Sequence, residues 1–267
     1  SAAGRKAPGT LKQERAAVVA LEGYMRPRVL EDVTPEMLEH WLSHRKSEGK
    51  KPPTMNRQLR VIKLMMRKAE AWKLADPQDW RSVKKAKEAP GKILFYSAAE
   101  LQRLAANSKG TWRTIVLLGA RAGLRRGEIH WLAWEDVDLG RARLHVCTKD
   151  GWVPKDSEQR WVNIPPDLAA YLKELPRDGR WVLGAERPSL VVMTAYMKKV
   201  LRRNGLQGNI HTMRHTFASH LVIAGRSLKE IAELLGHSTT ATTEIYAHLA
   251  PESKANAVSA LPVLKLP

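Results

Sequence analysis

The sequence predicts a mainly α-helical protein in two parts, with one small antiparallel β-sheet inside the second part. Apolar residues recur every three or four positions through most of the 267 residues, which is the spacing of a helix with one buried face. Strand-like alternation is convincing only between residues 139 and 164, where Gly140 and Gly151 supply turns. Residues 76–92 lose this periodicity and gain charge, which is typical of a segment that links two folded parts.

Four segments are therefore expected along the chain. Residues 1–10 are small and polar and are expected to be disordered. Residues 11–75 are expected to form a small helical domain, and residues 76–92 a linker. Residues 93–267 are expected to form a larger α+β domain that ends in a C-terminal tail.

Capping residues place two of the expected helix starts. Thr34 followed by Pro35 is typical of a helix start, because Thr accepts from free N–H groups and Pro fits the first turn. Ser97 and Glu100 have the spacing of a capping box. A longer helix is expected over about residues 54–73, where apolar positions recur at helical spacing.

The charge is strongly positive and spread along the whole chain. The net charge is +18; the first 90 residues carry 20 Lys+Arg against 11 Asp+Glu, and the remainder carries 25 against 16. A body that is basic throughout favours a nucleic acid partner, because each phosphate that is neutralised releases counterions. A basic solvated surface without such a partner is the alternative, since charge alone does not define a function.

Composition also limits the other classes of protein. A hydrophobic content of 43% is sufficient for a core, and no apolar run reaches the roughly 18 residues of a membrane span. Cys147 is the only cysteine, which excludes an internal disulfide and a zinc site built on cysteines. No apolar secretory segment is visible near the N-terminus, so a cytoplasmic location without membrane association is expected.

One face of the helix expected over residues 54–73 repeats basic side chains. These candidates for contacts with a DNA backbone are Arg57, Arg60, Lys63 and Arg67. The alternative interpretation is an ordinary solvated helix face, and the spacing fits both.

Three short motifs carry the functional prediction. The first contains Gly123-Leu-Arg125-Arg-Gly-Glu128, the second His211-Thr-Met-Arg214-His215-Thr, and the third Leu235-Gly-His237 with Tyr246 nine residues later. In this order the motifs resemble those of the tyrosine recombinase (phage integrase) family, which cuts and rejoins DNA through a phosphotyrosine bond. The resemblance covers residues 30–261 and is sharpest between residues 123 and 248.

The resemblance implies a role for each motif residue. Tyr246 is the expected nucleophile, and Arg125 and Arg214 are expected to hold the phosphate, because the planar guanidinium meets two phosphate oxygens and stays charged. His211 is expected to exchange a proton with the phenol or to donate to a phosphate oxygen. His237 is expected to donate to a non-bridging oxygen. Glu128 is expected to orient Arg125 or to support the fold.

The family also carries a general-acid lysine on a β-hairpin between the two arginine motifs. Lys149 and Lys155 both lie in the expected sheet region. Lys155 is preferred because Arg160, Val162 and the Ile164-Pro165 pair follow it in the family's order. Asn163 stands where the family usually has proline, so Lys149 remains the alternative.

The resemblance implies an architecture and a reaction as well. A core-binding domain and a catalytic domain are expected to close around duplex DNA as a C-shaped clamp, with no cofactor, because the covalent bond conserves the energy of the broken one. The chain is expected to be a monomer when free and a homotetramer on two DNA sites. The arm-binding domain that phage members often carry at the N-terminus is not visible here.

Other interpretations compete with this one. His211, His215 and His220 have helical spacing that suits zinc ligands, but Arg214 lies beside them and no further ligand of suitable spacing is evident, so no metal site is expected. His215, His220 and His248 are expected to be structural. A type IB topoisomerase-like enzyme shares the chemistry but rejoins the same strand. A DNA-binding protein without catalysis is the alternative from another class.

Overall fold

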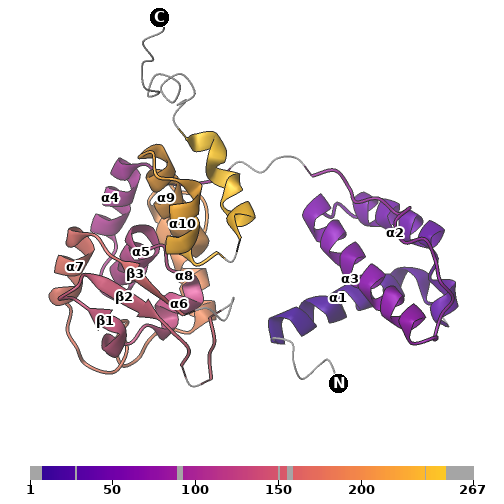
Figure 1. The fold of residues 1–267 in the computed structure, drawn as a ribbon, viewed down its shortest axis with the longest axis horizontal. Coiled ribbons are helices and arrows are strands. Elements are labelled where there is room, and N and C mark those ends of the chain that lie inside the picture. Colours follow the sequence, from indigo (N-terminus) through magenta and orange to yellow (C-terminus); the bar gives the residue numbers. More distant parts are fainter. Residues whose placement is uncertain are drawn as a thin grey trace, which may run out of the picture. The chain divides into compact units, whose positions relative to one another are not determined.

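The computed structural model describes residues 8–27, 29–88, 93–149, 151–154, 159–237 and 239–250. Within these residues it is mainly helical, with one three-stranded antiparallel sheet, which confirms the predicted fold class (Figure 1). The chain divides into two compact units, residues 1–91 and residues 92–267. None of the described helices combines the length and the apolar character needed to cross a membrane.

In the described residues, the first unit consists of three α-helices and a following irregular segment. Its helices are α1 (Pro8–Met25), α2 (Pro35–Ser47) and α3 (Pro52–Ala71), with a short 3-10 turn η2 (Leu30–Asp32) before α2. Both α1 and α2 pack against α3. The predicted Thr34 cap is present, since Met37 N donates to Thr34 Oγ1 at 3.3 Å. Helix α1 begins at Pro8, so the expected disorder of residues 8–10 is wrong; residues 1–7 lie outside the described residues.

The segment predicted as a linker belongs in large part to the first unit. Trp80 and Val83 are each only 2% exposed and lie in the same apolar cluster as Leu59 and Ile62 of α3. Trp80 Nε1 also donates to Glu70 Oε1 at 2.5 Å. The segment has no helical periodicity because its apolar side chains are buried one at a time from an irregular chain with a turn at residues 80–82.

The second unit contains the remaining elements. These are α4 (Ala98–Asn107), α5 (Thr111–Arg121), α6 (Arg126–Trp131), η3 (Trp134–Asp136), β1 (Val137–Asp138), β2 (Arg143–Val146), β3 (Arg160–Asn163), α7 (Pro166–Lys173), α8 (Leu190–Arg203), α9 (Ile210–Ile223), α10 (Leu228–Leu235), η4 (Thr240–Thr242) and η5 (Glu244–Leu249). The predicted capping box of α4 is present, with Ser97 and Glu100 bonded to each other's backbone N–H groups.

The sheet is antiparallel and has the order β1-β2-β3, with Leu144 opposite Val162. Leu144 and Val162 are fully buried, whereas Trp161, the neighbour of Val162 on β3, is exposed, as expected for a sheet with one face on a core. The sheet is short because only four residues of β2 pair with β3. It joins α6 to α7 and brings Arg160 to the interior of the unit.

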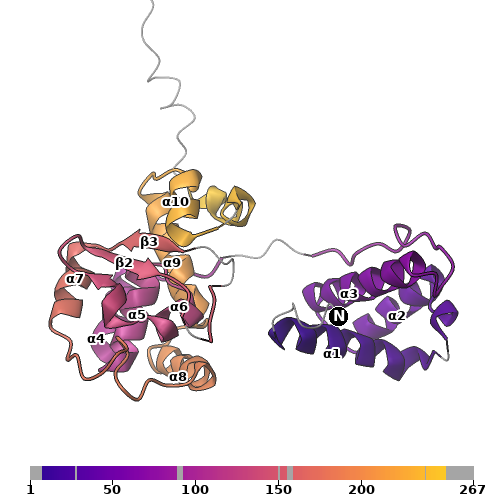
Figure 2. The same cartoon turned by 60° about the horizontal axis from the view of Figure 1, so that its bottom comes forward.

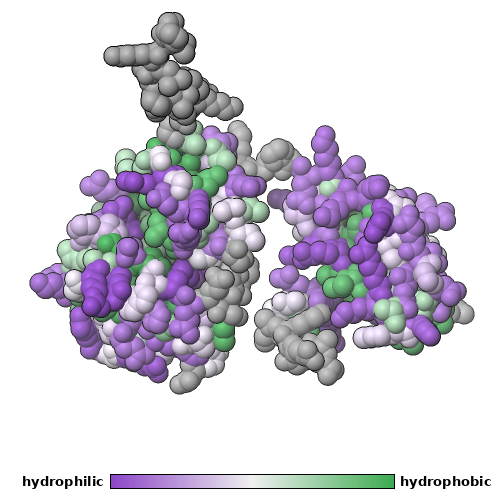
Figure 3. Space-filling view, viewed as in Figure 1, coloured by the Kyte–Doolittle hydropathy of each residue, from purple (hydrophilic) through white to green (hydrophobic). Residues whose placement is uncertain are grey.

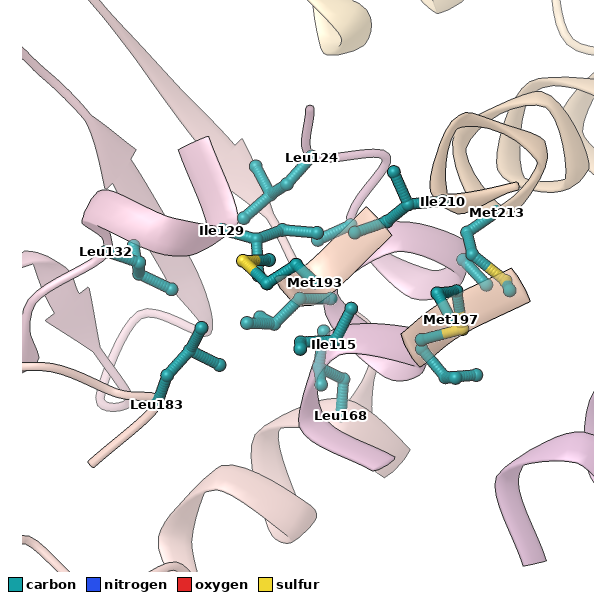
Figure 4. Packing of buried hydrophobic residues seen from close by; sticks show 14 of the residues in the cluster. Ile115, Leu124, Ile129, Leu132, Leu168, Leu183, Met193, Met197, Ile210 and Met213 are labelled. Atoms are coloured by element: carbon teal, nitrogen blue, oxygen red, sulfur yellow. The ribbon is translucent and has the colours of Figure 1, made fainter. Parts of the chain in front are cut away.

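The core of the second unit is built around α5 and α9. Helix α5 contacts α4, α6, α7 and α9, and lies among them in both views of the chain (Figures 1 and 2). Apolar side chains from α5, α6, α8 and α9 point toward one another there, among them Ile115, Ile129, Met193 and Met213 (Figure 4). These four residues are all fully buried. The faces of both units seen in Figure 3 are mostly hydrophilic, with hydrophobic residues in scattered areas.

Candidate active site

Arg214 projects from α9 into the interior of the second unit. Asn209 starts this helix by accepting from His211 N at 2.8 Å, so His211 lies in the first turn and is exposed. One turn later, Arg214 is only 6% exposed and donates to Gly123 O and to Leu235 O, each at 2.6 Å. Burial, followed by the nearby charge of Arg125, lowers the pKa of Arg214 to about 9, so the guanidinium remains charged at neutral pH.

Glu128 accepts hydrogen bonds from two of the arginines and so fixes their positions. Arg125 precedes α6 and donates its backbone N–H to Glu128 Oε2 at 2.8 Å and its Nη1 to Oε1 at 3.1 Å. Arg160 of β3 donates to the same two oxygens at 3.0 and 2.8 Å, which is a bidentate pair. Glu128 is 3% exposed, and burial alone would raise its pKa, but the bonds and charge of Arg160 and the N–H of Arg125 make the net shift a lowering.

The C-terminal end of α10 gathers three arginines. Three consecutive carbonyls accept from three different guanidinium groups: Leu234 O from Arg160 at 3.4 Å, Leu235 O from Arg214 at 2.6 Å, and Gly236 O from Arg125 at 3.0 Å. The last carbonyls of a helix have no partners within it and carry the negative end of the helix dipole. This helix end therefore attracts and orients the positive charges.

Gly236 makes this arrangement possible. It ends α10 in the left-handed conformation, with φ at +63° and ψ at +53°. This conformation is energetically unfavourable for residues other than glycine. A Cβ atom at this position would lie 2.8 Å from Arg160 Cδ, so the guanidinium packs directly against the glycine. The sequence motif around residue 236 thus needs glycine both for its backbone and for its lack of a side chain.

His237 follows Gly236 and is tied to the segment that carries the tyrosine. Its backbone N–H donates to Ala232 O at 2.9 Å, which completes the end of α10. Its Nδ1 lies 2.9 Å from the hydroxyl of Thr243, a fully buried residue at the start of η5. The orientation of the imidazole is therefore coupled to η5.

Tyr246 of η5 is buried against α9. Only 2% of Tyr246 is exposed, and its hydroxyl lies 2.6 Å from His215 Nδ1. Burial raises the pKa of the phenol to about 12, while the nearby charge of Arg214 acts in the opposite direction. The phenol is therefore protonated at neutral pH and needs a proton acceptor before it can act as a nucleophile.

Of the two lysines considered as the general acid, the structure describes only Lys149. Lys155 lies outside the described residues. The side chain of Lys149 is 8% exposed, and its Nζ donates to Asp136 Oδ1 at 2.7 Å and to Glu135 Oε1 at 2.9 Å. Burial would lower the pKa of Lys149, but the bonds to these two carboxylates make the net shift a rise.

The basic residues predicted on the first unit lie on α3. Arg57, Arg60 and Arg67 are exposed. Lys63 is half-buried and donates to Val83 O at 2.6 Å. Burial, and then the positive charge of Arg67, lowers the pKa of Lys63.

The histidines of α9 have separate partners. His215 Nδ1 lies beside the hydroxyl of Tyr246, and His220 Nε2 lies 2.8 Å from Tyr96 O. Elsewhere among the described residues, ligand atoms of Asp136, His145 and Cys147 lie within 4.8 Å of one another. The ammonium of Lys149 lies against that carboxylate, so the group already has a cation.

Sequence reasoning did not assign two residues of this site. Arg160 was used only as a marker of the lysine motif, although it is the bidentate partner of Glu128. His215 was expected to be structural, yet its ring contacts the hydroxyl of Tyr246. Its position four residues after His211 places both on one side of α9, and that spacing was the available signal.

Taken together, these groups define a class of protein. Fixed arginines, imidazoles and a buried phenol, in a basic helical chain, suit an enzyme that acts on phosphodiesters, because guanidinium groups can stabilise charge on the phosphate oxygens.

Residues 94–253 match the phage integrase family. The tyrosine recombinase XerA of Thermococcus kodakarensis is 31% identical over 229 residues, which is 79% of this chain and 76% of that protein. The integrase of Escherichia phage P2 is 28% identical over 232 residues, 86% of this chain and 66% of that protein. The fold is similar to that of the Tn1549 transposon integrase in complex with transposon right end DNA, with a TM-score of 0.78, 18% identity, and coverage of 96% and 94% of the two chains.

The chain belongs to the phage integrase family, and it is a tyrosine recombinase, an enzyme of the class that cuts and rejoins DNA at specific sites. The family and the class of reaction predicted from the three motifs are thereby confirmed. DNA is its partner.

Proposed function

We propose that the chain exchanges DNA strands at a specific site through Tyr246. The phenol oxygen attacks the scissile phosphorus, the bond from phosphorus to the 5′ oxygen breaks, and a 3′-phosphotyrosine and a free 5′-hydroxyl result. The 5′-hydroxyl of a second DNA then reverses the step. The observation that carries this proposal is the contact of the buried Tyr246 hydroxyl with His215, one residue from the buried Arg214 on the same helix.

Arg125 and Arg214 hold the phosphate in this proposal. Each is fixed by carbonyl acceptors and by the Glu128 network before DNA arrives, so little reorganisation is needed when charge builds up on the phosphate oxygens. Glu128 and Arg160 act as positioning residues, because their bonds set the place of Arg125. His237 donates to a non-bridging oxygen, and His211 either donates to a phosphate oxygen or exchanges the phenol's proton.

The proposal is tested by covalent capture. A pool of randomised duplexes that carry a nick is incubated with the protein; the short fragment released on cleavage diffuses away, which traps the adduct on a denaturing gel. Sequencing the trapped DNA gives the site. Tyr246→Phe should form no adduct and should bind that DNA almost as the wild type does, because only a hydroxyl is lost. A normal adduct with Tyr246→Phe would refute the assignment of the nucleophile.

The recovered site also separates the proposal from its two alternatives. Transfer of a labelled strand from one duplex to another is expected of a recombinase. Relaxation of a supercoiled plasmid without strand transfer would instead indicate a topoisomerase-like enzyme. Binding without any adduct would indicate a DNA-binding protein that has no catalysis.

Lys155 is proposed as the general acid. The alternative, Lys149, is paired with two carboxylates, and its backbone forms a bridge with Trp152, which supports a structural role for it. Lys155→Ala should slow cleavage, and a 5′-phosphorothiolate leaving group should restore the rate, because sulfur leaves without protonation. Rescue of Lys149→Ala, with no rescue of Lys155→Ala, would reverse the assignment.

The first unit is proposed to bind the DNA backbone as a core-binding domain, so that the two units close around the duplex as a clamp. The exposure of Arg57, Arg60 and Arg67 on one helix supports this role. Replacing these three arginines by alanine should weaken binding to all sequences alike and should reduce the salt slope of log K by about 1 per lost phosphate contact. An unchanged slope would show an ordinary solvated helix face.

The proposed assembly is a monomer in solution and a homotetramer on two DNA sites, in the cytoplasm. Residues 251–267 are proposed to dock on a neighbouring copy; they lie outside the described residues. Their deletion should spare binding to one site but weaken pairing of two sites. Multi-angle light scattering on paired sites measures the stoichiometry, and an unchanged tetramer would show that the tail is not needed for assembly.

A further inference from the structure

The hydroxyl of Tyr246 has a specific partner, His215, whose Nδ1 lies 2.6 Å away. Tyr246 is 2% exposed and His215 is half-buried, so water does not compete freely for this contact. On the basis of the proposed function, we infer that His215 is a catalytic residue that holds the Tyr246 hydroxyl and takes its proton as the phenol attacks phosphorus. Nothing in the three sequence motifs assigned it this role.

The direction of the hydrogen bond follows from the chemistry of the two groups. Among the described residues, no other group accepts from the Tyr246 hydroxyl. The imidazole can accept or donate at Nδ1 according to its tautomer; in the inferred catalytic form its own proton is on Nε2, so that the phenol donates to Nδ1. The two rings are tilted by 51° with centroids 5.8 Å apart, so they meet edge to edge through these atoms rather than by stacking.

The surroundings keep His215 ready to accept a proton. The titratable groups that the described structure sets against its ring are Arg214, next along α9, and the Tyr246 phenol from η5. Burial, and then the charge of Arg214, lowers the pKa of His215 below its ordinary value of 6.5, so the ring is neutral at pH 7. A protonated ring would lack the lone pair that holds the hydroxyl.

Proton transfer becomes favourable only during the attack. In the free protein the phenol has a pKa of about 12, so it keeps its proton. As the bond from Oη to phosphorus forms, Oη becomes an ester oxygen and loses its basicity, while the phosphate's negative charge stabilises an imidazolium. The phenol's proton passes to His215 Nδ1, the bond to the 5′ oxygen breaks, and that oxygen takes a proton from the general acid. Rejoining reverses each transfer.

The same geometry separates the roles of the two histidines of the second motif. His211 is exposed in the first turn of α9, whereas His215 lies one turn further along, at the phenol. We therefore assign proton exchange with Tyr246 to His215. His211 then has the other role considered for it, donation to a phosphate oxygen.

His215→Asn tests the inference, because Asn Oδ1 stands near the position of Nδ1 and accepts a hydrogen bond but cannot take the proton. Single-turnover cleavage is measured on the duplex recovered by capture, with a 5′-phosphorothiolate leaving group so that only nucleophile activation is probed. The rate should fall by about a hundredfold or more, the usual contribution of a general base. The wild-type rate should also fall as pH drops below 6.5, and the variant should lack that fall.

A more acidic nucleophile supplies the second arm. A ring-fluorinated tyrosine at position 246 gives up its proton more readily, so it should restore much more of the rate to His215→Asn than to the wild type. His248→Asn is the matched control: His248 is exposed, two residues after Tyr246, and its replacement should change nothing. Cleavage by His215→Asn within about threefold of the control, or an equal effect of fluorination on both proteins, would overturn the inference.

A measurement on the wild-type protein without DNA keeps the inference testable if His215→Asn does not fold. The ¹⁵N shifts of the His215 ring should indicate a neutral imidazole with its proton on Nε2 at pH 7. A proton on Nδ1 at that pH would overturn the inference. A normal adduct with Tyr246→Phe would instead refute the proposed function, so the two failures are distinguishable.

Discussion

Replacing Glu128 by glutamine should destabilise the second unit strongly. The carboxylate is 3% exposed and accepts from Arg160 at 3.0 and 2.8 Å and from Arg125 at 2.8 and 3.1 Å. Glutamine keeps the shape but turns one oxygen into an NH₂ group, which faces N–H donors and loses two of these bonds. Each bond to a charged group contributes about 1.5–3 kcal/mol, and removing one partner of a buried ion pair costs about 3–5 kcal/mol. We expect a loss of about 3–5 kcal/mol.

Hydrogen exchange of peptides from α5 and α9 measures this loss, because these helices report the second unit alone. Glu135→Gln is the matched control. Glu135 also accepts from two cations, Lys149 at 2.9 Å and Arg180 at 3.0 Å, but its side chain is 57% exposed. An exposed ion pair contributes about 0–1 kcal/mol, so the control should lose less than about 1 kcal/mol. Equal losses in the two variants would refute the argument that burial makes the Glu128 network strong.

Glu128→Gln should also change how the free energy of unfolding depends on pH in the acidic range. The net pKa shift of Glu128 is a lowering from 4.5, so its contribution is fully present above that value and is lost as pH falls through the lower folded value. The wild type should therefore lose stability in this acidic range, and Glu128→Gln should lose less over the same range. Urea unfolding at a series of pH values from 6 downward checks the sign.

Three further outcomes follow from the site and the fold. Arg125→Ala and Arg214→Ala should each slow single-turnover cleavage by about a hundredfold or more and change DNA binding much less; rates within about tenfold of the wild type would contradict the phosphate-holding role. Gly236→Ala should lower the free energy of unfolding by about 1–2 kcal/mol through the left-handed backbone alone, and the added Cβ should displace Arg160. Thermal melting measures the loss of stability, and the cleavage rate measures the effect of displacing Arg160. Trp80→Ala should lower the stability of the first unit by about 3–5 kcal/mol, because Trp80 packs in the apolar core that α3 shares. If hydrogen exchange of α3 peptides is unchanged by this substitution, the segment is only a linker.

Local chemistry explains which parts of the fold were predictable. Thr34 and the Ser97–Glu100 pair are short-range signals, since a cap needs only residues within one turn, and both caps are present. The strands around residues 144 and 162 were visible because one face of the sheet is buried and the other is exposed. Helix α1 was not predicted as a helix, because its apolar positions form only a weak stripe without a capping signal at its start.

The segment after α3 shows why other parts were not predictable. Residues 76–88 carry charge and lack periodicity, which is also the pattern of a linker. Their place in the first unit depends on Trp80 and Val83, whose partners on α3 lie 10 or more residues earlier in the chain. A contact of this kind leaves no periodic trace in the sequence.

The sequence by itself determined the family, because three motifs stand in a particular order along the chain, and it predicted which side chains react with the phosphodiester. The tertiary structure alone decided how these side chains are held. Arg125, Arg160 and Arg214 come from three separate segments and meet at the carbonyls of residues 234–236, where the end of a helix supplies acceptors that no motif encodes. In the same way, only folding brings Tyr246 to His215, 31 residues away, and so identifies the base for the phenol.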